Sequence, residues 1–296
     1  MKKITLLSLF YLFLFSSCLN EDKEDEIDLE APSILPYASN ASVQPEYFLK
    51  TDTNTNEIPV AFSITDATGI QEIKLESHSG FDGHTHGKTA STVNLKFKLF
   101  SHSEVIEAEQ ITDPTLFNYS TSIFWDDRNP DIDEDELILG GPYHFSIQAT
   151  DVEGNETKYS DNSTYHTTLY LNTTYAPQVE LTDLDIANEN IVGKVYRNTD
   201  HNASSDISFL WIYIEEPSTE NTGQEGTILK EWVWGESNWP HQYRANEGNT
   251  LPDDQEIDLQ SLFANNSDFF TKLQGNTLVV WAEDTNGNIS VNQFNN

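Results

Sequence analysis

One local signature occurs twice in this chain and limits what the chain can fold into. An apolar segment runs into Asp151-Val-Glu-Gly-Asn155, and a second one runs into Asp284-Thr-Asn-Gly-Asn288. Glycine adopts the positive φ that a tight turn requires, and aspartate and asparagine side chains bond to the nearby backbone, so each signature predicts a hairpin turn. The openings also match, because Ala31-Pro-Ser-Ile34 is echoed by Ala176-Pro-Gln-Val179. The sequence therefore predicts two consecutive units of related construction.

Strand patterns fill both units. Segments such as Ile70–Ser77 and Tyr143–Asp151 are rich in β-branched and aromatic residues, and turn residues separate them. We predict an all-β chain of two tandem immunoglobulin-like β-sandwiches, residues 31–174 and 175–296, each filling its own core. The chain has a single cysteine, which excludes the inter-sheet disulfide of antibody domains.

The first residues predict a lipoprotein signal peptide, residues 1–17. Two lysines precede the apolar run Ile4–Phe15, which is too short for a transmembrane helix. Small residues then lead to Cys18, and a lone cysteine at this place resembles the lipobox of bacterial lipoproteins, in which the cysteine carries the lipid. The alternative is an ordinary cleaved signal with an incidental cysteine.

Residues 18–30 comprise that cysteine and the acidic segment that follows it. So many charges cannot bury enough apolar surface to fold, so we expect a solvated tether. The acidic run also resembles the export signal that sends some lipoproteins to the outer face of the outer membrane, and a periplasmic spacer is the alternative. We expect a lipid-anchored protein of the outer membrane that faces the cell surface.

Charge and motif content narrow the function classes. The formal net charge of −34 and the isoelectric point near 4.2 argue against nucleic acid, whose phosphates would be repelled. The lipid is the expected membrane contact, and cations are the natural partners of such a surface. The sequence has no G-x-S-x-G, no H-E-x-x-H and no phosphate loop. We therefore predict no catalytic residues and no enzyme activity.

Histidines gather in the stretch HSGFDGHTHGK. His84 and His86 are two residues apart, which in an extended backbone points both rings to the same side, and His78 precedes the glycine-containing loop. We predict that His144, from a later strand, joins these three as a fourth ligand. Imidazole donors without cysteine suit zinc first and copper(II) second. Asp82 is a candidate further ligand, or it could orient one of the rings by accepting a hydrogen bond from it.

These residues carry a family resemblance. The segment Phe81-Asp-Gly-His-Thr-His86, the strand Gly141-Pro-Tyr-His-Phe-Ser-Ile147 and the turn Asp151–Asn155 resemble the lipoprotein family called domain of unknown function 4625. The resemblance covers about residues 31–160 and implies a lipobox, an Ala-Pro opening and a recurrent histidine loop. It implies no activity.

A second hypothesis uses the later half of the chain. Trp232 and Trp234 alternate on one predicted strand, and if exposed they would form a stacking platform of a glycan- or protein-binding surface module with an envelope partner. If buried, they are core. His102, His166, His201 and His241 are scattered in the sequence, and no site is predicted from them.

Overall fold

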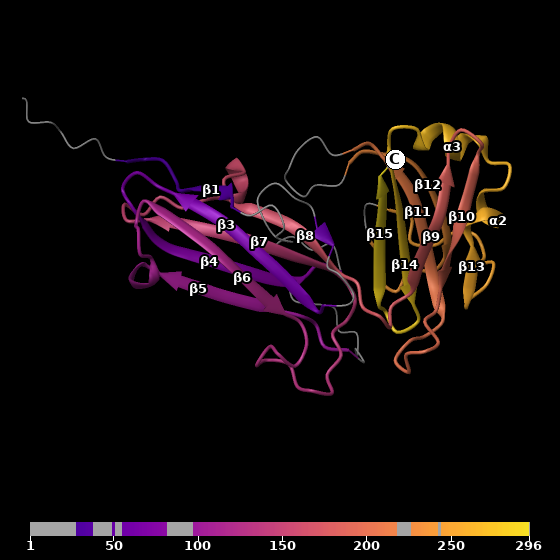
Figure 1. Cartoon of the computed structure of the whole chain (residues 1–296), viewed down its shortest axis with the longest axis horizontal. Coiled ribbons are helices and arrows are strands. Elements are labelled where there is room, and N and C mark those ends of the chain that lie inside the picture. The colour runs from indigo at the N-terminus through magenta and orange to yellow at the C-terminus, as the bar shows by residue number, and fades with distance from the viewer. Residues whose placement is uncertain are drawn as a thin grey trace, which may run out of the picture. The chain divides into compact units, whose positions relative to one another are not determined.

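The protein is described by a computed structural model (Figure 1). It describes residues 28–37, 49–50, 55–81, 97–217, 226–241 and 244–295. Backbone contacts separate a short segment, Met1–Glu30, from one compact body, Ala31–Asn296, and the fold below is that of this body.

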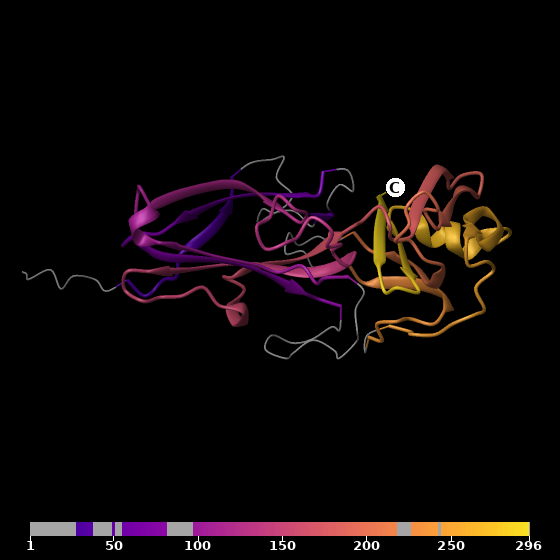
Figure 2. The ribbon, with the colours of Figure 1, turned by 90° about the horizontal axis from the view of Figure 1, so that it is seen from below.

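The first half of the body is a pair of sheets. A three-stranded antiparallel sheet has the order β1-β3-β6, and a five-stranded sheet has the order β2-β8-β7-β4-β5, in which only β2 runs parallel to its neighbour. Figure 2 shows the two sheets as layers. The elements are β1 (Ser33–Pro36), β2 (Leu49–Lys50), β3 (Glu57–Thr65), β4 (Ile70–Ser79), β5 (His102–Glu107), η1 (Ala108–Gln110), β6 (Leu116–Phe124), β7 (Gly141–Asp151), η2 (Tyr159–Asp161) and β8 (Tyr165–Leu171).

Alternation along β4 shows why these residues form a sandwich. Ile73, Leu75 and Ser77 are buried between the sheets, whereas Lys74 and Glu76 are partly or fully exposed on the outer face. A period of two is what a strand with one buried face requires. The five-stranded sheet therefore has an apolar inner face and a polar outer face.

The second half repeats the sandwich. A three-stranded sheet, β13-β10-β9, lies with a four-stranded sheet, β12-β11-β14-β15, and all pairs are antiparallel. The strands are β9 (Gln178–Asp185), β10 (Asn190–Tyr196), β11 (Ile207–Glu215), β12 (Ile228–Gly235), β13 (Glu256–Asp258), β14 (Thr277–Asp284) and β15 (Ile289–Asn295).

Two short helices, α2 (Leu259–Phe263) and α3 (Ser267–Leu273), cover the core of this half. Each begins at a side chain that accepts hydrogen bonds from its first turn, Asp258 for α2 and Asn266 for α3. Such caps satisfy backbone N–H groups that a short helix leaves without partners.

The prediction of an all-β, sandwich-like fold is confirmed. One buried cluster lies entirely in the second half, but the other spans both halves, which differs from the expectation of a separate core in each half. Among the described residues no sheet mixes strands from the two sides of residues 172–177, yet one cluster of buried side chains contains Tyr143 and Tyr175 together with Trp211, Trp239 and Trp281. The two halves share apolar surface, because both faces of the β11–β14 pair carry large apolar side chains.

Hydrogen bonds join the same two halves. The side-chain amide of Asn172, just after β8, donates to the carbonyl of Val291 and accepts from the N–H of Val291, both at 3.1 Å. These are the two backbone groups that a neighbouring strand would otherwise bond to. Ile289 N donates to Gly140 O at 2.8 Å, and Tyr175 Oη donates to Ile138 O. In the part of the chain that the structure describes, no helix is both long and apolar enough to span a bilayer.

Candidate functional site

The outer face of the five-stranded sheet brings two predicted ligands together. His78 on β4 and His144 on β7 are direct partners in the antiparallel register, and their ring centroids are 5.5 Å apart. Their neighbours Ser77 and Phe145 are buried between the sheets, so both rings lie on the outer side. The strand register thus pairs two residues that are far apart in the sequence.

The backbone at the end of β4 orients the His78 ring. His78 Nδ1 lies 3.2 Å from the carbonyl oxygen of Ser79. When Nδ1–H donates to that carbonyl, the lone pair is on Nε2, which is then the nitrogen able to bind a metal. This contact therefore favours Nε2 of His78 as the metal-binding nitrogen.

Gly80 gives the His144 ring its room. A Cβ at this position would lie 3.3 Å from His144 Cδ2, closer than side chains normally pack, and 3.4 Å from Nε2. Gly80 N also donates to Pro142 O at 3.1 Å, which extends the β4–β7 pairing past the last residue of β4. The Nε2 edge of His144 consequently lies over Gly80, after which the chain continues toward His84 and His86.

The loop ligands lie outside the described residues. This applies to His84, His86 and Asp82, so convergence of the four histidines stays a prediction. Within the described ranges, no third histidine, cysteine or carboxylate joins His78 and His144 in a group whose ligand atoms all lie within 4.8 Å of one another. The strands supply a pair of donors, and further ligands would have to come from the loop or from solvent.

A further histidine lies on this face, and no sequence pattern predicted it there. His166 on β8 pairs with Ser146, which is two residues along β7 from His144, so His166 shares the outer face. Its ring packs against Tyr159 at 5.5 Å, and burial lowers the pKa of the imidazole. It lies two strands from His78 and two residues further along, about 12 Å away, too far to bind the same ion. Alternation along the sequence shows which residues of β8 share a face with His166. It does not show that this is the face of His78 and His144, because that depends on how the strands pair.

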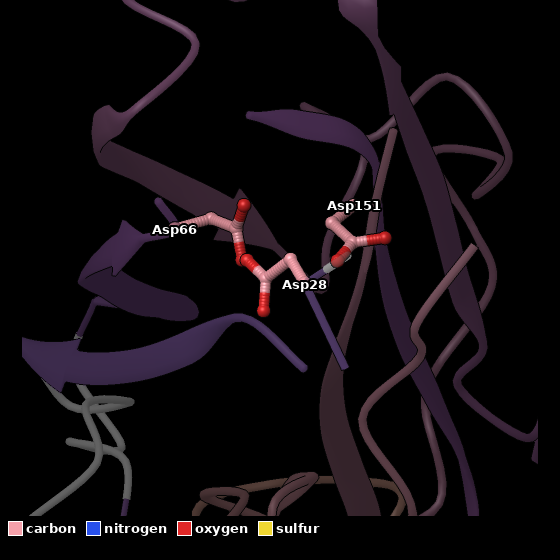
Figure 3. Close-up of side chains that lie close together, drawn as sticks. All are labelled: Asp28, Asp66 and Asp151. Atoms are coloured by element: carbon pink, nitrogen blue, oxygen red, sulfur yellow. The ribbon is translucent and has the colours of Figure 1, made fainter. Parts of the chain in front are cut away.

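Acidic side chains meet at the opposite end of β7. Asp66, in the turn after β3, and Asp151, at the end of β7, have carboxylate oxygens within 4.8 Å of each other (Figure 3). Asp66 accepts from the N–H of Gly69 at 2.7 Å, and Asp151 accepts from both N–H groups of Asn155 at 2.7 Å. These bonds show that both carboxylates hold turns.

The two tryptophans of the alternative hypothesis pack into the second half. Trp234 is buried, and Trp232 is partly buried with its ring 5.2 Å from Phe263 and 5.5 Å from Phe269. Both phenylalanines belong to the α2 and α3 helices. The rings fill the space between the four-stranded sheet and the helices and do not form an exposed stacking platform.

Comparisons with known proteins add a family. A search of curated proteins finds no match. Solved structures that are similar include the calcium binding domain CBD12 of CALX1.1, at 13% identity over 79% of this chain and 74% of that chain with a TM-score of 0.23. Dimeric latent PorU from Porphyromonas gingivalis is similar at 14% identity over 92% of this chain and 20% of that chain, with a TM-score of 0.26. The CupB2 chaperone from Pseudomonas aeruginosa is similar at 7% identity over 83% and 95%, with a TM-score of 0.21.

Likeness at this level supports no argument about function. The family comparison is more specific, because its match contains His78, the loop and His144. The sequence model of the family described as domain of unknown function (DUF4625) matches residues 16–164, half of the chain, and the chain belongs to this family.

Proposed function

We propose that this chain is a lipid-anchored, surface-exposed binding protein that holds a divalent transition metal, zinc or copper(II), in its first half. His78, His84, His86 and His144 are the proposed ligands. The observation that carries the proposal is the direct pairing of His78 with His144, with ring centroids 5.5 Å apart on the outer face of the sheet. Two imidazoles on neighbouring rigid strands form a chelating pair whose geometry does not depend on the loop.

The chemistry of the donors supports this class of ion. Neutral imidazole nitrogens are borderline donors that suit zinc and copper(II) better than calcium or magnesium. The net charge of −34 raises the local concentration of every cation and gives no selectivity, so the histidines must provide it. Because each ligand must be neutral to bind, affinity should fall below about pH 6.

Metal titration of the compact body, Ala31–Asn296, tests the proposal. The wild-type protein should bind close to one equivalent of zinc, and His144→Ala should weaken binding at least about tenfold, the scale for losing one group that fixes a metal site. His84→Ala and His86→Ala should weaken binding to a similar extent. Unchanged affinity in these two variants would mean that the metal is held by His78 and His144 together with water.

His166→Ala is the matched control for this titration. His166 is a half-buried histidine on the same outer face, two strands from His78. Its substitution should leave zinc affinity unchanged. Wild-type protein that binds no zinc or copper(II) at micromolar free concentration, or equal losses for His166→Ala and His144→Ala, would refute the metal site.

The anchor is proposed from the sequence and needs its own experiment. Cys18→Ala should move the protein from the membrane fraction to the soluble fraction, because the lipid is attached at that sulfur. Replacing the acids between Glu21 and Glu30 with serine should reduce accessibility to protease added outside intact cells. Retention of Cys18→Ala in the membrane would exclude the lipid anchor, and unchanged accessibility would leave the acidic segment as a spacer.

A further inference from the structure

The histidine pair lies near a contact between the two halves of the body. Phe81, three residues after His78, is buried with 4% of its surface exposed. Its ring meets Tyr143 edge-on at 5.4 Å and the ring of Trp239, from the second half, at 5.0 Å. It also lies against Gly141, where an added Cβ would be 2.5 Å from the ring. Phe81 is thus held between the first residues of β7 and a tryptophan from the other half.

Trp239 is itself fixed by polar contacts inside the second half. Its Nε1 donates to Gly287 O at 2.8 Å, and its backbone N donates to Ser237 Oγ at 3.0 Å. Its carbonyl accepts from Arg244 Nη2 at 3.1 Å, and that guanidinium also donates to the fully buried carboxylate of Glu283 at 2.9 Å. One hydrogen bond holds the ring nitrogen and two hold the backbone of Trp239, so the ring cannot move away from Phe81 without breaking the buried bond at Nε1.

The second half also holds the start of β7. Gly140 N donates to Asn288 Oδ1 at 3.1 Å, and Gly140 O accepts from Ile289 N at 2.8 Å. Gly140 is four residues from His144, and Phe81 is three residues from His78. Both strands that carry the pair are therefore fixed at the same end by the same half of the chain.

We propose that the second half of the chain positions the histidine pair, with Trp239 acting on Phe81 as the positioning contact. The inference rests on the proposed metal site and assigns a role to residues beyond the family match, which ends at residue 164. The Ser79–Tyr143 pair transmits the contact, since Phe81 packs on Tyr143 and His78–His144 is the next pair along the register. Holding strand ends in register keeps two donor rings at a fixed spacing, which lowers the entropy that metal binding must overcome.

Zinc affinity of Ala31–Asn296 variants provides the first test. Trp239→Ala should lower affinity about tenfold, as expected for a group that orients ligands from outside the coordination sphere. Trp239→Phe keeps an aromatic ring against Phe81 and should remain close to wild type. Trp234→Ala is the control, because Trp234 is a buried tryptophan of the same half that packs on Phe263 instead. Equal losses for Trp239→Ala and Trp234→Ala, or no loss for Trp239→Ala, would overturn the inference.

Hydrogen exchange separates failure of this inference from failure of the metal site. The Gly80 amide, which bonds to Pro142 O, should exchange faster in metal-free Trp239→Ala than in metal-free Trp234→Ala. This readout does not require the wild-type protein to bind metal. Equal exchange rates at Gly80 in the two variants would refute the positioning role even if zinc binds as proposed.

Discussion

The two Asp-x-x-Gly-Asn turns have the same internal geometry and opposite surroundings. In the first turn Asp151 accepts from Asn155 N at 2.7 Å and Nδ2 at 2.7 Å, and in the second Asp284 accepts from Asn288 N at 2.8 Å and Nδ2 at 3.1 Å. The glycines have φ of +88° and +89°. The turn is therefore set by its own residues, whatever lies around it.

The surroundings decide what each turn contributes to the fold. Around Gly154 an added Cβ would meet nothing within 4 Å, whereas at Gly287 it would be 3.2 Å from Trp239 Nε1. Asn288 is fully buried and its Oδ1 accepts from Gly140 in the other half, while Asn155 is partly exposed. One motif ends a hairpin near solvent, and its copy joins the two halves.

Substitutions that affect the residue before each aspartate should give the largest difference in the free energy of unfolding between the two turns. Glu283 is fully buried and ion-paired with Arg244, whose guanidinium lies 4.9 Å from the Trp281 ring, whereas Thr150 holds the equivalent place in the first turn. Arg244→Leu strands a buried carboxylate and should lower the free energy of unfolding by about 3–5 kcal/mol. Thr150→Val should change it by less than about 0.5 kcal/mol. Denaturant unfolding measures both, and a loss below about 1 kcal/mol for Arg244→Leu would contradict the assigned role of the pair.

The next largest effect should be on the pH dependence of stability, through Asp284. Burial raises the pKa of Asp284 to about 6 from its ordinary value of 3.8. Between these values the folded state binds a proton that the unfolded chain releases, so this group makes stability fall as pH rises from about 4 to 6, by up to about 3 kcal/mol in total.

Substitution isolates that contribution. Asp284→Asn should remove the downward slope with rising pH, whereas Asp151→Asn should retain it, because Asp284 is still present. His102 and His166 have pKa values lowered by burial and give a slope of the opposite sign, so the comparison must be made between variants and wild type at each pH. Identical slopes for Asp284→Asn and wild type would show that Asp284 does not titrate in this window.

Substitution of the asparagine that ends each turn should give a smaller difference in stability. Asn288→Ala removes the acceptor of Gly140 N and leaves buried polar groups unpaired, which should cost about 3 kcal/mol. Asn155→Ala opens a partly exposed turn to water and should cost about 1 kcal/mol. Matched thermal unfolding of the two variants gives the difference. Equal losses would mean that the bond from Asn288 to the first half adds nothing to stability.

Much of the candidate site was open to sequence reasoning, and the remainder was not. The loop histidines and His144 could be put forward as candidate ligands from the sequence, and the structure describes only His78 and His144 of that set. The sheet face of His166 could not, because it follows from the pairing of Ser146 with His166, which no local pattern encodes. Phe81 and Trp239 come from different halves of the chain, and no local sequence pattern around either residue predicts their contact.

The sequence by itself determined the class of fold and the form of the turns. Alternation of apolar and polar residues is local, so it predicts strands, and the Asp, Gly and Asn of each turn bond within five residues. Only the tertiary structure decided which copy of the turn is buried, that one buried cluster spans both halves, and that His78 lies opposite His144. These outcomes depend on strand register and on side chains that come from distant parts of the chain, and a difference of one residue in register would move His78 to the other face.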